Sequence, residues 1–138
     1  MATILIVDDS DNFRHMLELV FKNEGHDVIG AASGAEAIAL AAKAKMIDLV
    51  IADQVMPGMP GTTLAQRLRV VASTRAAQIV ILTATMRRKD VEEAKESGAA
   101  GWLSKPIDLV RLKAYVKAVL AGDFESLKRI ASGGKDAA

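Results

Sequence analysis

Short apolar stretches alternate with longer amphipathic stretches along this chain, and four of the short ones end at a polar residue. The four lie at residues 3–7, 48–52, 78–82 and 101–104, and their Val, Ile and Leu content is typical of β-strands. One more strand, the second in chain order, is expected near residues 27–32. Strands that alternate with helices predict a parallel sheet of the α/β class.

Helical periodicity fills the first two intervals between these strands. After the first strand, apolar residues recur three and four positions apart, as one buried helix face requires: Phe13, Met16, Leu17, Val20 and Phe21. Gly25 is expected to end that helix in the C′ position. Ser33 and Glu36 have capping-box spacing and predict a second helix. Its buried face is expected to comprise Ile38, Ala39 and Ala42.

Three more helices complete five strand–helix pairs, a (βα)5 unit. The third follows a loop rich in Pro and Gly at residues 56–61 and should bury Leu64, Leu68 and Val71. The fourth, near residues 87–97, has little beyond Val91 and Ala94 to bury, so we expect it to be weakly anchored. The fifth, near residues 108–121, has a full apolar face comprising Leu109, Leu112, Val116, Val119 and Leu120.

Composition narrows the class of protein. With 138 residues, 51% of them hydrophobic, the chain can bury one continuous core. Its formal charge of +1 gives no reason to expect direct binding to nucleic acid or to an anionic membrane. The absence of cysteine excludes disulfides and thiolate metal sites. Since no signal peptide or membrane-spanning run is expected, the sequence predicts a cytoplasmic protein.

Reactive side chains follow four of the predicted strands: Asp8, Asp9, Asp53, Thr83 and Lys105. Because parallel strands share one carboxyl edge, where open α/β sheets bind ligands, these side chains should converge. Clustered carboxylates raise one another's pKa unless a cation intervenes, and Mg²⁺ suits such oxygen ligands. A carboxylate beside a metal, an ammonium and a hydroxyl is arranged to attack phosphorus and form an aspartyl phosphate.

The motifs resemble the receiver domain of bacterial two-component response regulators, most of all the stand-alone receivers of the chemotaxis type. The resemblance covers about residues 2–121 and implies a doubly wound, flavodoxin-like sheet with strand order 2-1-3-4-5. In that family an acidic pair after the first strand holds Mg²⁺, and Asp8 and Asp9 match it. The phosphoacceptor is an Asp followed by Pro four residues later and Gly eight residues later, which Asp53, Pro57 and Gly61 match.

The resemblance also implies roles for residues near the other strand ends. Thr83 matches the family's hydroxyl after the fourth strand, and Lys105-Pro106 matches a Lys-Pro pair whose peptide bond is cis. The backbone carbonyl of Val55 corresponds to a third metal contact. Trp102, three residues before the Lys, corresponds to the family's switch aromatic, which moves together with the hydroxyl residue.

The implied function is that of a single-domain response regulator. A sensor histidine kinase or a histidine phosphotransfer protein would phosphorylate Asp53, and the face made by the fourth helix, fifth strand and fifth helix would bind a downstream target. Self-catalysed phosphorylation and dephosphorylation would be its only reactions. Residues 1–121 are expected to form the receiver domain and residues 122–138 a short tail. Two interpretations of the tail stay open, an irregular end and a short amphipathic helix carrying Phe124, Leu127 and Ile130.

Other interpretations remain for the motifs and for the whole chain. Taken alone, Asp8 and Asp9 could serve only the dipole of the first helix, and Lys105 could be a surface charge. A Mg²⁺-dependent phosphatase with an aspartyl intermediate is one alternative, although such enzymes usually have Asp where this chain has Val55. A flavin-binding electron carrier is another, but its phosphate loop would not be acidic. Val55 and Thr85 occupy the two positions at which many receivers place residues that influence the hydrolytic water, and valine cannot hydrogen-bond that water.

Overall fold

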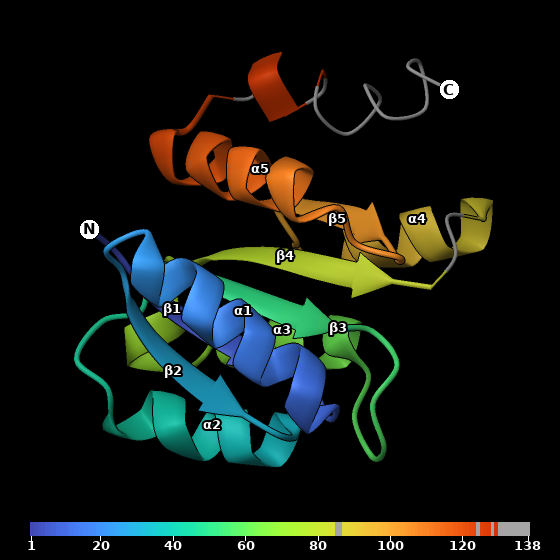
Figure 1. The fold of residues 1–138 in the computed structure, drawn as a ribbon. Coiled ribbons are helices and arrows are strands. Elements are labelled where there is room, and N and C mark those ends of the chain that lie inside the picture. The colour runs from blue at the N-terminus through green and yellow to red at the C-terminus, as the bar shows by residue number, and fades with distance from the viewer. Residues whose placement is uncertain (85–86, 124, 128, 130–138) are drawn as a thin grey trace.

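The protein has one sheet of five parallel strands in the order β2-β1-β3-β4-β5, with helices on both faces (Figure 1). The computed structural model describes residues 1–84, 87–123, 125–127 and 129. The strands are β1 (Thr3–Val7), β2 (Asp27–Ala31), β3 (Leu49–Asp53), β4 (Gln78–Thr83) and β5 (Gly101–Ser104). The helices are α1 (Asp11–Asn23), α2 (Gly34–Lys43), α3 (Gly61–Leu68), α4 (Arg88–Glu96) and α5 (Leu109–Ala121), with a 3₁₀ turn at Ala72–Thr74. The predicted fold class and strand order are confirmed.

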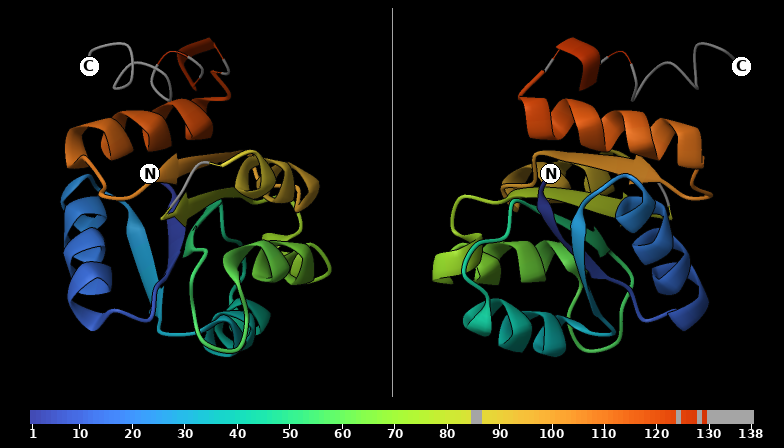
Figure 2. Two further views of the ribbon diagram at one scale, coloured as in Figure 1. Left: turned by 90° about the vertical axis from the view of Figure 1, so that its right-hand side faces the viewer. Right: turned by 60° about the vertical axis from the view of Figure 1, so that its left-hand side comes forward.

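Successive side chains of the strands enter two separate cores, one on each face of the sheet. In β1, Ile4 and Ile6 belong to the core that α1 and α5 cover, whereas Leu5 and Val7 belong to the core under α2 and α3. Figure 2 shows α1 and α5 on one side of the sheet and α2, α3 and α4 on the other. Because β3 is buried along its whole length, its last residue, Asp53, is held inside the molecule.

Two serine side chains and a glycine define the ends of α1 and α2. The Ser10 hydroxyl accepts a hydrogen bond from the Phe13 backbone N–H at 3.3 Å and caps α1 directly after the acidic pair. Ser33 accepts from the Glu36 N–H at 3.1 Å, so the predicted start of α2 is confirmed. Gly25, just beyond α1, has φ +90°, a conformation that side chains with a Cβ rarely adopt.

Three residues predicted to lie on buried helix faces are exposed: Met16, Ala39 and Ala42. Seven others are only half-buried: Phe13, Val20, Ile38, Val71, Val91, Leu109 and Leu120. In α2 the buried residues are instead Gly34, Ala37 and Ala41. Alanines occur all around this helix, so residue type did not distinguish its two faces. Val71 follows the end of α3, which stops at Leu68.

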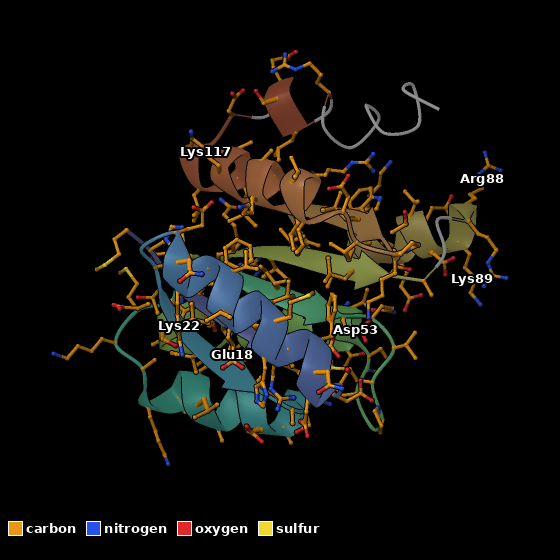
Figure 3. All side chains as sticks on the ribbon, in the orientation of Figure 1. Glu18, Lys22, Asp53, Arg88, Lys89 and Lys117 are labelled. Atoms are coloured by element: carbon orange, nitrogen blue, oxygen red, sulfur yellow. The ribbon has the colours of Figure 1, made fainter. Side chains whose placement is uncertain are left out.

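Helix α4 has little apolar contact with the rest of the fold, as predicted. Of its nine residues only Ala94 is buried, and Val91 is half-buried. Arg88 and Lys89 at its start extend away from the body of the protein (Figure 3). No helix within the described residues is long and apolar enough to cross a membrane.

Helix α5 ends at Gly122, which has φ +70°. Beyond it, residues 125–127 and 129 are helical, and Leu127 is buried in the core shared by α1 and α5. The other two apolar residues predicted for a tail helix, Phe124 and Ile130, lie outside the described residues. The division of the chain into residues 1–121 and 122–138 stays a prediction.

Candidate functional site

Three carboxylates meet at the carboxyl edge of the sheet. Asp8 and Asp9 follow β1. Asp53, which is labelled in Figure 3, is the last residue of the neighbouring strand β3. Val7 pairs with Ala52 in the parallel register, which places Asp8 beside Asp53. One oxygen of each carboxylate lies within 4.8 Å of the other two. Asp8 and Asp53 are 2% and 5% exposed, whereas Asp9 is open to solvent.

Lys105 supplies a positive charge to this acidic cluster. Its Nζ lies 3.2 Å from Asp53 Oδ2 and 3.6 Å from Asp8 Oδ2. The same atom lies 4.8 Å from the centre of the Phe13 ring on α1, within the range of a cation–π interaction. Lys105 follows β5, and its backbone N–H donates to the Thr83 carbonyl at 2.7 Å. The structure therefore brings the ammonium to the carboxylates, from the far side of β4.

The electrostatics of Asp53 reflect two opposing effects. Burial raises the pKa of its carboxyl above the ordinary value, and the negative charge of Asp8 acts in the same direction. The Lys105 ammonium opposes them by favouring the ionised form. Burial thus disfavours the ionised form of Asp53, and the adjacent Lys105 ammonium partly offsets that effect.

The acidic cluster fits a divalent cation. Asp8 Oδ2 is buried and accepts no hydrogen bond from the described residues, although it pairs with Lys105. A buried oxygen of this kind is costly unless a cation faces it. Exposed Asp9 leaves the cluster open to solvent, and oxygen ligands of this type suit Mg²⁺. Asp8, Asp9 and Asp53 could therefore hold a metal ion together.

Arg14, which the sequence analysis did not single out, holds the loop that carries the acidic pair. Its guanidinium is buried and donates to the Asp8 carbonyl at 2.7 Å and to Asp11 Oδ1 at 2.6 Å. The bond to Arg14 keeps the pKa of the Asp11 carboxyl below its ordinary value. Asp8 Oδ1 in turn accepts the Ser10 N–H at 2.8 Å. The Asp11–Arg14 spacing of three residues on a helix was the available sequence signal.

Thr83 and Trp102 lie on the two strands between the acidic cluster and α5. Thr83 ends β4 and is 7% exposed. Trp102 pairs with Ile81 across the β4–β5 ladder and is half-buried against the core under α2 and α3. Tyr115 of α5, which the sequence analysis did not single out, is buried. Its burial raises the pKa of its phenol, whereas its hydrogen bond with the Trp102 backbone lowers that pKa.

Two further predicted positions border the cluster. The Val55 side chain is 67% exposed, and its backbone N–H donates to Asp53 Oδ1 at 3.4 Å. The Lys105–Pro106 peptide bond is cis. Thr85 lies outside the described residues.

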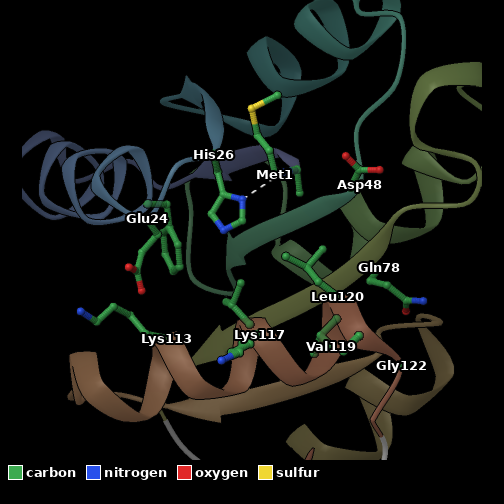
Figure 4. A pocket seen from close by; sticks show the side chains of 14 residues that line it. Met1, Glu24, His26, Asp48, Gln78, Lys113, Lys117, Val119, Leu120 and Gly122 are labelled. Atoms are coloured by element: carbon green, nitrogen blue, oxygen red, sulfur yellow. Dashed lines mark hydrogen bonds between the residues drawn. The ribbon is translucent and has the colours of Figure 1, made fainter.

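A cavity of about 860 Å³ lies at the opposite edge of the sheet (Figure 4). It is lined at the amino ends of the strands by residues such as His26, Asp48 and Gln78, and by Lys113 and Lys117 of α5. His26 Nδ1 accepts the Ala2 N–H there at 3.0 Å. None of the three clustered carboxylates lines it, so the cavity is separate from the candidate site.

Comparison with known proteins identifies the family of this chain. The response regulator receiver domain family matches residues 4–117. Protein PilH of Pseudomonas aeruginosa is 38% identical over 122 residues, which cover 88% of this chain and all of PilH. Response regulator PleD of Caulobacter vibrioides is 38% identical over 118 residues, 86% of this chain but only 26% of PleD.

Comparison with solved structures supports the same family assignment. The chemotaxis protein CheY4 of Vibrio cholerae superposes with a TM-score of 0.81 at 35% identity, covering 86% of this chain and 98% of CheY4. The similarity therefore covers nearly the whole length of CheY4. The family match spans all five strands, from β1 to β5, and most of α5. The chain therefore belongs to the response regulator receiver domain family.

Proposed function

We propose that this chain is a response regulator whose Asp53 accepts a phosphoryl group from a histidine kinase or a histidine phosphotransfer protein. The observation that carries the proposal is the ion pair between Asp53 and Lys105, 3.2 Å long, inside a cluster of three carboxylates. In the transfer, an Asp53 oxygen bonds to phosphorus as the bond from phosphorus to the donor's histidine nitrogen breaks. That nitrogen keeps the electron pair of the broken bond.

Mg²⁺ is the proposed metal, held by the carboxylates of Asp9 and Asp53 and by the Val55 carbonyl, with the Asp8 carboxylate acting mainly through water. When bound, it would offset the negative charge on the transferring phosphoryl oxygens. The buried Asp8 oxygen that accepts no hydrogen bond from the described residues supports this assignment. The Arg14 bond to the Asp8 carbonyl supports it too, because it fixes the backbone of the acidic pair.

Lys105 and Thr83 are proposed to bind the phosphoryl oxygens directly. The Lys105 Nζ already lies against Asp53, so its ammonium could donate a charge-assisted hydrogen bond to a group attached there. Thr83 ends β4, the strand next to β3, and its hydroxyl would donate a second one. Asp53 as nucleophile and these two donors would make up the catalytic residues of the self-catalysed reaction.

Output is proposed to pass through Thr83 and Trp102 to the face made by α4, β5 and α5, which would bind a downstream protein. Thr83 would move toward the phosphoryl group, and Trp102 would change its packing in response. The support is positional: the two residues lie on paired strands, and Trp102 is only half-buried, so its environment can change. The thin apolar face of α4 would let that helix shift at small cost.

The single tryptophan makes this switch measurable. Beryllofluoride with Mg²⁺, a phosphoryl mimic, should change Trp102 emission in the unmodified protein, and Thr83→Ala should remove most of that change while ligand binding persists. Thr63→Ala on α3 is the matched control and should respond as the unmodified protein does. Equal emission changes in Thr83→Ala and the control would mean that Trp102 does not respond to Thr83.

Val55 is proposed to slow loss of the phosphoryl group. Hydrolysis needs a water placed in line opposite Asp53, and positioning of that nucleophile strongly affects the rate. An apolar side chain cannot hydrogen-bond this water, so Val55→Asn should speed dephosphorylation severalfold at fixed Mg²⁺. Val70→Asn is the control, because Val70 is also exposed but follows α3. Label loss no faster in Val55→Asn than in Val70→Asn would show that Val55 does not limit hydrolysis.

Receiver domains of this family are signalling switches rather than conventional enzymes. Acetyl phosphate with Mg²⁺ tests whether this holds for the proposed site. A switch should accept about one phosphoryl group per chain and then stop. Continuous release of inorganic phosphate, at a rate far above the loss of label, would instead indicate a phosphatase with an aspartyl intermediate.

A further inference from the structure

Four hydrogen bonds connect the residue after the proposed phosphoacceptor with helix α4. Gln54 Oε1 accepts the Thr62 backbone N–H at 2.8 Å, and Gln54 Nε2 donates to Thr62 Oγ1 at 3.1 Å. The Thr62 hydroxyl donates to Glu93 Oε1 at 3.0 Å, and Gln54 Nε2 also reaches that oxygen at 3.4 Å. We call Gln54, Thr62 and Glu93 the polar clamp. It joins the end of β3, the first turn of α3 and the middle of α4.

The polar clamp matters for α4 because this helix has so little else to hold it. Only Ala94 of its residues is buried, so the hydrogen bonds that the Glu93 carboxylate accepts from Thr62 and Gln54 contribute to its attachment. Thr62 is 5% exposed, and loss of Glu93 would leave its hydroxyl proton without this acceptor. An unsatisfied buried donor costs more than the bond itself contributes.

The polar clamp matters for the phosphoacceptor because the backbone beside it has no free space. A Cβ at Gly61, the residue before Thr62, would lie 2.6 Å from the Asp53 carbonyl oxygen, so α3 begins in direct contact with Asp53. The Gly61 N–H donates to the Gln54 carbonyl at 3.2 Å, and the Gln54 N–H donates to the Leu82 carbonyl at 2.8 Å. A shift of Thr62 must therefore move the backbone that carries Asp53 and Val55.

We propose that Glu93 is a positioning residue, through which α4 holds residues 53–55 in the geometry that binds Mg²⁺ and receives the phosphoryl group. This inference rests on the proposed function of Asp53. Its action is indirect, since the hydrogen bonds that Glu93 accepts among the described residues come from Gln54 and Thr62. The coupling is reciprocal: whatever draws α4 away weakens Mg²⁺ binding by the same factor by which Mg²⁺ opposes that movement.

The test compares three variants of the full chain by two measurements. Mg²⁺ affinity is measured by calorimetry, and the rate of labelling by acetyl phosphate is measured at saturating Mg²⁺. Glu93→Ala should weaken Mg²⁺ binding and slow labelling, each by about threefold or more. Glu93→Gln keeps an oxygen acceptor for Thr62 and should restore both values. Glu92→Ala removes the same charge from an exposed neighbour on α4 and should change neither.

Each outcome decides one question. Equal behaviour of Glu93→Ala and Glu92→Ala would overturn the positioning role while leaving phosphorylation of the unmodified chain intact. If Glu93→Gln were as impaired as Glu93→Ala, the charge of Glu93 rather than its hydrogen bonds would matter, and the polar clamp would be rejected. Absence of labelling in the unmodified chain at saturating Mg²⁺ would instead overturn the proposed function, and the positioning role with it.

Discussion

Asp53→Asn should abolish labelling by acetyl phosphate, whereas the unmodified chain should gain one phosphoryl group in the presence of Mg²⁺. Asparagine has nearly the same shape as aspartate, but its amide is a far weaker nucleophile than the carboxylate that the proposed reaction needs. The Lys105 Nζ also lies 3.2 Å from Asp53, nearer than its 3.6 Å to Asp8, so a phosphoryl group bonded to Asp53 would lie beside the ammonium. Intact-mass spectrometry measures the effect directly.

The matched control is Asp27→Asn, the same change at an exposed aspartate that begins β2, at the opposite edge of the sheet. It should be labelled to the same extent as the unmodified chain. Undiminished labelling of Asp53→Asn would contradict the assignment of the acceptor. Loss of labelling in both variants would mean that the substitution acts through stability, which thermal unfolding of each variant would reveal.

Removal of Asp9 should eliminate Mg²⁺ binding. Asp9 is the exposed member of the acidic cluster and offers its oxygens from the solvent side, whereas Asp8 is buried and already paired with Lys105. We therefore expect Asp9 to be a direct ligand and Asp8 to act mainly through water. In calorimetry Asp9→Ala should lose more than the roughly tenfold to hundredfold in affinity that loss of a supporting residue typically costs.

Glu36→Ala is the control for the loss of a negative charge. Glu36 is exposed in the first turn of α2, which follows β2 at the carboxyl edge of the sheet but lies outside the acidic cluster. Its variant should bind Mg²⁺ as the unmodified chain does. Unchanged affinity in Asp9→Ala would place the metal elsewhere, and equal losses in both variants would indicate a general charge effect rather than ligation.

The fold could be predicted well because its strands carry a strong local signal. The run from Ile4 to Val7 is apolar throughout, which marks a strand, and the helices between successive strands make the strands parallel. Direction then determines which residues meet, because parallel strands share an edge. Asp8 and Asp53 are 45 positions apart in sequence, yet register alone places them on neighbouring strand ends.

Features that depend on packing between helices could not be predicted in this way. In α2 the alanines occur on every side, so only the docked helix shows that Ala37 and Ala41 face inward. The link from Gln54 to Glu93 spans 39 positions and depends on where α4 lies, which its short apolar face does not specify. Arg14 looks like a surface charge in sequence, since its acceptor at Asp8 is a backbone carbonyl.

The most direct test of the central claim identifies the phosphorylated residue by chemical reduction rather than by substitution. Borohydride reduces an aspartyl phosphate to homoserine and leaves ordinary carboxylates unchanged. The unmodified chain is labelled with acetyl phosphate and Mg²⁺, reduced, digested and sequenced by mass spectrometry. We predict homoserine at position 53 and at no other aspartate. Homoserine at Asp8 or Asp9, or a label that resists borohydride, would contradict the account.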